Sequence, residues 1–143
     1  MKRIELTVSR VIPAMPAEVF DVWLDSKSPG GPWFGCERVI LNPVVDGLFY
    51  HLVQHEGRDW AHHGRFVRLE RPHFIEHTWM SEATRGFESK VAVTLDAKGD
   101  NTLFVLHHTG LPDDAMGRQH EEGWKFVAGA ITDRFAAARR AKG

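Results

Sequence analysis

The chain has 143 residues, of which 43% are hydrophobic and 26% charged, and its formal net charge is -1 with histidine neutral. This length fits one domain with its own core, so we expect a single domain over residues 1–143. The near-zero charge argues against a nucleic acid or an anionic membrane as partner, and no apolar run is long enough to span a membrane. A lone cysteine, Cys36, excludes an internal disulfide, and a cytoplasmic location is expected.

The first part of the chain predicts a strand, a short helix and a loop. Apolar and polar residues alternate over residues 4–8, as in a half-buried strand. Apolar residues recur at helical spacing over residues 17–24. The Gly- and Pro-rich stretch 28–32 cannot continue that helix, and it predicts a loop that presents Trp33 and Phe34.

The middle of the chain predicts strands joined by short turns. We expect strands at residues 36–41, 48–55, 60–70, 74–80, 91–95 and 104–108. Turn signals such as Asp46-Gly47 and the Gly-Asp-Asn triplet 99–101 separate several of them. Consecutive strands joined by short turns pair as an antiparallel meander.

The last stretch, residues 113–140, has the apolar spacing of one long amphipathic helix. Residues 110–112 are expected to form the turn that precedes it, and Gly123 suggests a close approach to the helix backbone. One face is expected to pack on the sheet through Met116, Trp124, Val127, Ile131 and Phe135.

These elements predict an α+β fold in which a curved antiparallel sheet wraps around the long C-terminal helix. The apolar face of such a sheet needs a cover, and the terminal helix is the largest amphipathic element available. A strongly curved sheet gripping one helix leaves a cavity between the two.

Several motifs stand out along the chain: residues 16–20, 32–35, 45–49 and 64–72, the His-Thr-Trp triplet 77–79, residues 108–112 and the Glu-Gly-Trp triplet 122–124. Together they resemble the START-like (SRPBCC) superfamily with its helix-grip fold, and most of all the homologues of the activator of the 90-kDa heat-shock chaperone ATPase. The resemblance covers nearly the whole chain in the right order. It implies a domain of a superfamily that includes lipid carriers, hormone receptors, aromatase/cyclases and chaperone-binding domains.

Strand phase, together with the face of the terminal helix for His120 and Trp124, directs an unusual set of histidines and tryptophans toward the expected cavity. The predicted pocket-lining residues are His51, Trp60, His62, His77, Trp79, His108, His120 and Trp124. Neighbouring histidines at 62–63 and 107–108 alternate across a strand, so at most one of each pair can face inward. Three interpretations stay open: core histidines satisfied by their neighbours, a pocket for a polar or aromatic ligand, or a metal site.

The expected function is therefore a small-molecule ligand-binding or interaction domain whose partner is a small hydrophobic or aromatic ligand. The alternatives are a polyketide cyclase- or aromatase-like enzyme with His77 or His108 as general base, and a chaperone-interacting domain. No catalytic residue is assigned, because no nucleophile elbow, phosphate loop or dinucleotide fingerprint is present. No metal or cofactor is expected, since no HxH or HxxxH pair is in register. A monomer or homodimer is expected.

Overall fold

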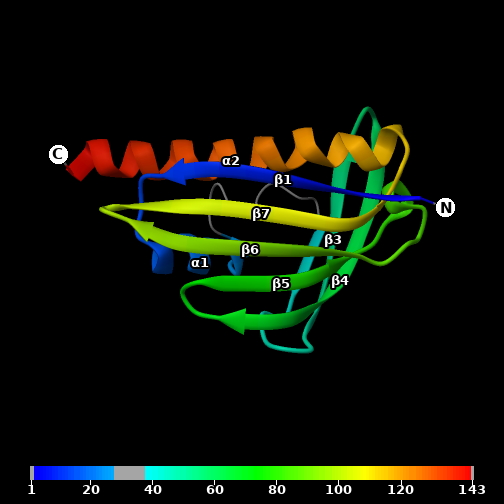
Figure 1. Ribbon diagram of the computed structural model, residues 1–143, viewed down its shortest axis with the longest axis horizontal. Coiled ribbons are helices and arrows are strands. Elements are labelled where there is room, and N and C mark those ends of the chain that lie inside the picture. The colour runs from blue at the N-terminus through cyan, green and yellow to red at the C-terminus, as the bar shows by residue number, and fades with distance from the viewer. Residues whose placement is uncertain (1, 28–37, 143) are drawn as a thin grey trace.

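A computed structural model describes residues 2–27 and 38–142 (Figure 1). Cys36, the predicted Trp33–Phe34 loop and the first residues of the predicted strand 36–41 lie outside this range. The elements in chain order are β1 (Arg3–Ile12), α1 (Pro16–Trp23), β2 (Arg38–Leu41), β3 (Leu48–His55), β4 (Arg58–Glu70), β5 (Phe74–Trp79), the 3-10 helix η1 (Glu82–Thr84), β6 (Ser89–Lys98), β7 (Asn101–Pro112) and α2 (Ala115–Lys142).

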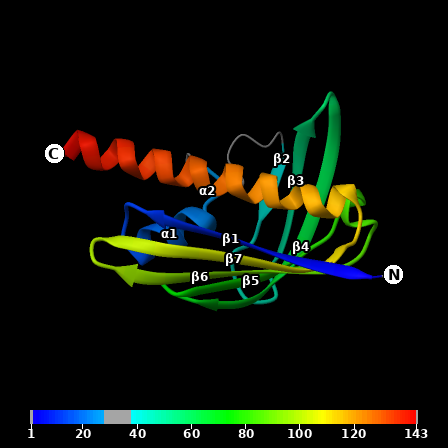
Figure 2. The ribbon, with the colours of Figure 1, turned by 45° about the horizontal axis from the view of Figure 1, so that its top comes forward.

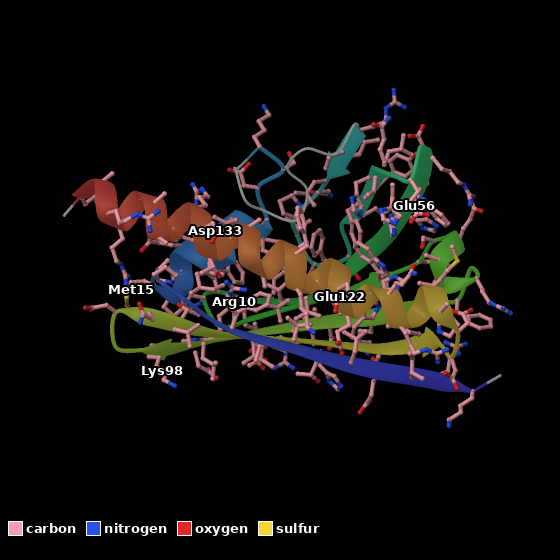
Figure 3. All side chains as sticks on the ribbon, turned by 90° about the horizontal axis from the view of Figure 1, so that it is seen from above. Arg10, Met15, Glu56, Lys98, Glu122 and Asp133 are labelled. Carbon is pink, nitrogen blue, oxygen red and sulfur yellow. The ribbon has the colours of Figure 1, made fainter. Side chains whose placement is uncertain are left out.

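The strands of the described chain form one antiparallel sheet in the order β1-β7-β6-β5-β4-β3-β2. The register between β4 and β5 shifts between Phe66 and Arg68, and a bulge of this kind bends the strand that carries it. The β3–β4 hairpin consequently stands up beside the N-terminal half of α2 (Figure 2). Its tip, at Glu56, lies at the opposite end of the domain from Met15 and Lys98 (Figure 3). The predicted α+β helix-grip class is confirmed.

Helix α2 lies along the concave face of the sheet and buries Trp124, Ala128, Ile131 and Phe135 there. Val127 packs partly against the same core. The prediction for Met116 was wrong, because its side chain is 37% exposed. The first turn of α2, which carries Met116, lies beside η1 at the end of the domain away from α1 (Figure 1).

The entry into α2 also differs from the prediction. Residues 110–112 are not a turn, because β7 continues through Pro112, which is paired with Arg3 of β1. The side chain of Asp114 accepts a hydrogen bond from the backbone N–H of Gly117 at 2.7 Å and so caps the helix start. Gly117, rather than Gly123, is the glycine with a close neighbour. A Cβ at 117 would lie 2.0 Å from the Pro112 carbonyl oxygen, whereas nothing lies within 4 Å of a Cβ at 123.

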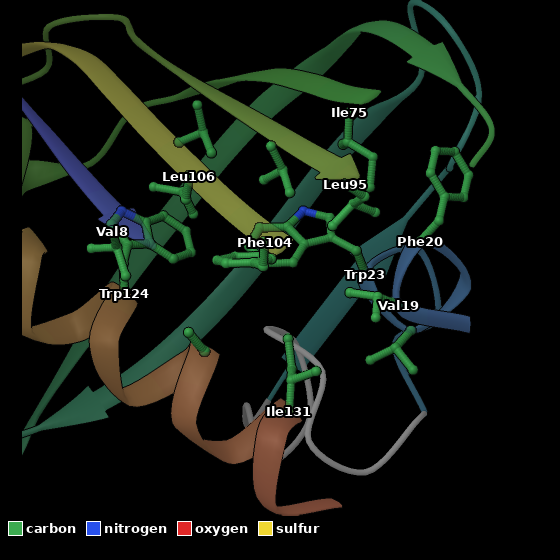
Figure 4. Close-up of a cluster of buried hydrophobic side chains, with 14 of the residues drawn as sticks. Val8, Val19, Phe20, Trp23, Ile75, Leu95, Phe104, Leu106, Trp124 and Ile131 are labelled. Carbon is green, nitrogen blue, oxygen red and sulfur yellow. The ribbon is translucent and has the colours of Figure 1, made fainter. Parts of the chain in front are cut away.

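The shorter helix, α1, covers the other part of the concave face, next to the C-terminal half of α2. Val19, Phe20 and Trp23 point from it into the core, where Ile131 of α2 also lies (Figure 4). These positions recur at three and four residues, which places them on one face of a short helix. No described helix has both the length and the apolar character needed to cross a membrane.

Candidate functional site

Aromatic and imidazole rings gather on the concave face between the two helices and the β3–β4 hairpin. We call this group the ring cluster; it consists of Trp23, Phe49, His51, His62, His77, Trp79, His108 and Trp124, with His120 at its edge. The register brings rings from distant strands together. His51 is paired directly with His62, and Val91 is paired with both His77 and His108, so these last two lie in one row across the sheet.

His77, on β5, is held by a tryptophan from α1. The indole N–H of Trp23 donates to Nε2 of His77 at 3.3 Å, and an indole nitrogen can only donate. The ring proton of a neutral His77 is therefore on Nδ1, which donates to the Thr78 carbonyl at 2.9 Å. Burial lowers the pKa of His77 to about 4, so this ring is neutral at pH 7 and both of its nitrogens are in use.

His108, on β7, is held in the same way by a tryptophan from α2. The indole N–H of Trp124 donates to Nδ1 of His108 at 2.9 Å, so the ring proton is on Nε2. Nε2 lies 2.8 Å from Oγ of Ser89, and that hydroxyl donates to the Trp79 carbonyl at 2.6 Å. Burial, followed by the proximity of His120, sets the pKa of His108 well below its ordinary value. His77 and His108 thus have opposite tautomers, each fixed by a helix tryptophan.

The cluster also contains two buried nitrogens of a different kind. Nδ1 of His62 and Nε1 of Trp79 have no hydrogen-bond partner among the residues that the structure describes. The two rings are neighbours, with centroids 4.7 Å apart, and their residues are 8% and 6% exposed. An unsatisfied buried polar group costs about 1–3 kcal/mol, so two adjacent ones mark a place where a hydrogen-bonding group from elsewhere would stabilise the domain.

Burial also lowers the pKa values of the other three histidines of the ring cluster. It lowers the pKa of His51 to about 3, with further lowering from His62 and His77, and it lowers the pKa of His62 to about 4. The pKa of His120 is lowered as well, and its Nδ1 lies 2.9 Å from the Met116 carbonyl within α2. The ring cluster therefore offers neutral donors and acceptors in an apolar surrounding.

Most of the predicted pocket residues come together in this cluster. His51, His62, His77, Trp79, His108 and Trp124 are buried in it, and the half-buried His120 contacts His108 with ring centroids 5.3 Å apart. Trp60 lies apart from them on the β3–β4 hairpin. Its indole N–H reaches the His55 carbonyl at 3.4 Å, and Arg58 lies over its ring at 4.1 Å.

The expected alternation of neighbouring histidines is confirmed. His62 and His108 are buried, whereas His63 is exposed and His107 is half-buried. Side chains on adjacent strand positions point to opposite faces, which is the reason the sequence could separate them.

Sequence reasoning missed two residues of the cluster, Trp23 and Phe49, and the Ser89 hydroxyl that contacts His108. Trp23 was assigned only to the apolar face of the first helix, Phe49 only to its strand, and Ser89 to no element. A signal for Ser89 existed, because it precedes Val91 by two positions and therefore shares the inward face of β6.

Open grooves on the described part of the molecule include two that contain no predicted pocket residue. The larger, about 550 Å³, is lined by Ala61, His63, Met80, Ser81, Glu82, Arg85 and Gly86. The smaller, about 230 Å³, is lined by Glu18, Asp21, Val22, Asp25, Arg134 and Phe135. Among the described residues no group of three or more His, Cys, Asp or Glu side chains could hold a metal ion. The cavity at the ring cluster stays a prediction.

Known proteins of the same fold are numerous. The chain resembles protein CV1439 from Chromobacterium violaceum (TM-score 0.76, 18% identity, 92% of this chain and 96% of that chain). It also resembles PFC0360w, an HSP90 activator from Plasmodium falciparum (TM-score 0.69, 19% identity, 84% and 86%). The Aha1 dimer from Colwellia psychrerythraea matches with a TM-score of 0.70 and 12% identity over 92% and 96% of the chains. At these identities the likeness shows the fold.

No curated protein matches this sequence significantly. The family model described as "Activator of Hsp90 ATPase homolog 1-like protein" matches residues 13–136, which is most of the chain. The match includes the two helix tryptophans and every histidine of the ring cluster. The protein therefore belongs to the family of activator of Hsp90 ATPase homolog 1-like proteins.

Proposed function

We propose that this domain binds a small, largely apolar or aromatic ligand at one side of the ring cluster, between the β3–β4 hairpin and the N-terminal half of α2. We call this the hairpin side; it contains His62 and Trp79. The observation that carries the proposal is the pair of buried nitrogens without partners, Nδ1 of His62 and Nε1 of Trp79. Ligand sites combine an apolar lining with a few placed polar groups, and the rings of His51 and Trp124 supply such a lining at 5.2 and 4.9 Å from the Trp79 ring.

The ligand reaches these nitrogens when the hairpin and α2 move apart. The hairpin stands beside the N-terminal half of α2 at the rim of the domain (Figure 2). Entry at this rim leaves the Trp23–His77 and Trp124–His108 hydrogen bonds in place. Binding consequently requires no change in the two hydrogen bonds that join the helices to the sheet.

A cyclase-like reaction is a weaker proposal for the same residues. A general base needs a nitrogen with an accessible lone pair in reach of the substrate proton. His77 and His108 use theirs to accept from Trp23 and Trp124. Taking up a proton would break these buried hydrogen bonds, so we assign both histidines a structural role.

A binding screen tests the proposal. Native mass spectrometry and isothermal titration calorimetry would use dodecanoate, quercetin and indole, with ¹H–¹⁵N spectra to locate the site. We expect at least one compound to bind, to shift the Trp79 indole resonance and to be recovered unchanged. If all three leave the spectrum unchanged up to millimolar concentration, the proposal is wrong. A product that accumulates would instead favour the enzyme.

Chaperone interaction is the second candidate, and the family supports it. The observation in its favour is an exposed apolar area at the edge strand: Ile40 of β2 and Leu48 of β3 are 61% and 65% exposed. Ile40 is paired with Tyr50, which shares a strand face with Leu48, so the two side chains lie on the same side of the sheet. The test is the ATPase rate of a purified 90-kDa chaperone with the wild-type domain and with Ile40→Asp. Stimulation by the wild type alone supports this candidate, and no stimulation by either removes it.

A further inference from the structure

The two unpartnered nitrogens have complementary hydrogen-bonding capacities. Nε1 of Trp79 can only donate. Nδ1 of His62 is buried without a partner, whereas Nε2 is not among the buried atoms that lack one. The proton of the neutral ring is therefore placed on Nε2, and Nδ1 is left as an acceptor. One donor and one acceptor therefore lie side by side in the cluster.

We infer that the ligand presents a hydroxyl group to this pair, accepting from Trp79 and donating to His62. A hydroxyl is the smallest organic group that does both through one atom. This inference rests on the proposed function, and it narrows the ligand to a phenol or an alcohol. The neighbouring rings favour a phenol, because the aromatic body would contact Trp124 and His51 while its hydroxyl reaches the two nitrogens.

The charge of the site argues against a carboxylate in the same position. The titratable side chains of the ring cluster are all histidines, and burial keeps His51 and His62 neutral at pH 7. A carboxylate has two acceptor oxygens and no donor, so it leaves Nδ1 of His62 unsatisfied. It would also lose its hydration without meeting a cation. A ligand with no polar group at this position leaves both nitrogens as they are.

Three probes of one shape separate these possibilities: 2-naphthol, 2-methylnaphthalene and 2-naphthoate, titrated by calorimetry at pH 7. We expect 2-naphthol to bind about tenfold more tightly than 2-methylnaphthalene, and 2-naphthoate to bind most weakly. In Trp79→Phe and in His62→Leu the preference for 2-naphthol should fall to within about twofold, with 2-methylnaphthalene still bound. The matched controls are Trp60→Phe, on the hairpin away from the cluster, and His63→Leu, on the opposite face of β4. Both should keep the preference.

A spectrum of the wild-type protein covers the case in which a variant fails to fold. The indole ¹H–¹⁵N signal of Trp79 should move downfield with 2-naphthol and should not do so with 2-methylnaphthalene. Equal affinities for 2-naphthol and 2-methylnaphthalene, or tightest binding of 2-naphthoate, would overturn the hydroxyl inference and leave ligand binding standing. If none of the three probes binds, the proposed function falls together with the inference.

Discussion

The two sides of the ring cluster treat buried polar groups differently. On the central strands β5 and β7, His77 and His108 each accept a hydrogen bond from a tryptophan of a helix, and their second ring nitrogens also have partners. On the hairpin side, where β4 lies next to the end of β5, His62 carries a buried acceptor and Trp79 a buried donor, and neither has a partner in the described chain. Satisfied buried polar groups specify how helices seat on the sheet, whereas unsatisfied ones cost stability. The contrast separates residues that hold the fold from residues that we assign to a ligand.

Lowering the pH should have the largest effect on the free energy of unfolding. Below pH 6.5 the unfolded chain protonates its histidines, whereas folded His51, His62 and His77 take up protons only at about pH 3 to 4. Their contribution to stability is thus complete above pH 6.5 and is lost as the pH falls toward 4. At pH 5 the loss is about 2 kcal/mol per histidine and roughly 6 kcal/mol for the three. Urea unfolding at pH 7 and pH 5 measures it.

The same experiment on His62→Leu sharpens this prediction. The variant has one buried histidine fewer, so its loss between pH 7 and pH 5 should be smaller by about 2 kcal/mol. A wild-type protein that is as stable at pH 5 as at pH 7 would show that the cluster histidines are not kept neutral by burial.

Removing a histidine should lower the free energy of unfolding by at least about 2 kcal/mol more at His108 than at His62. His108→Leu leaves the Trp124 indole N–H buried without an acceptor, and we expect a loss of about 3 kcal/mol in the free energy of unfolding at pH 7. His62→Leu removes an acceptor that has no donor, so its cost should stay below about 1 kcal/mol. Denaturant unfolding compares the two. Equal losses would contradict the division.

The corresponding tryptophan pair makes one chemical change at both sites. Trp124→Phe and Trp79→Phe remove the same ring and the same N–H, from residues that are 5% and 6% exposed. Trp124→Phe also leaves Nδ1 of His108 unsatisfied, so we expect it to cost about 2 kcal/mol more than Trp79→Phe. Thermal unfolding at pH 7 decides this, and a costlier Trp79→Phe would reverse the assignment.

Much of the fold could be predicted because it depends on periodicity. Alternation on the strands places His62 inward and His63 outward, and the three- and four-residue spacing on α2 places Trp124 and Ile131 against the sheet. The surroundings of the N-terminal end of α2 could not be predicted in this way. Whether Met116 is covered, and whether Gly117 or Gly123 meets a neighbour, depends on where β7 ends and on its Pro112 carbonyl.

The site was predictable as a set of inward positions and not as a network. Phase alone could not show that Trp23 and Trp124 donate hydrogen bonds to the buried histidines of β5 and β7. Those bonds depend on where each helix packs across the sheet. Phase also directed Trp60 inward, and the structure places this half-buried ring beneath the Arg58 guanidinium at 4.1 Å.

Transition metals are expected to have the smallest effect on the stability of the domain. His51 and His62 face each other with ring centroids 5.0 Å apart, but no third ligand from the described residues joins them. Equimolar zinc or nickel should therefore leave the melting temperature of untagged protein unchanged within about 1 °C. Near-stoichiometric zinc, nickel or copper by elemental analysis would show this prediction to be wrong.

The tautomers and titration of the imidazole rings test the central claim most directly. Long-range ¹H–¹⁵N spectra between pH 7 and pH 5 should show a neutral His77 protonated at Nδ1 and a neutral His108 protonated at Nε2. Both should be unaffected by 2-naphthol, whereas the Nδ1 signal of His62 should shift when the probe is added. A His77 or His108 that titrates near pH 6.5, or that responds to 2-naphthol while His62 does not, would contradict the separation of fold-holding and ligand-binding histidines.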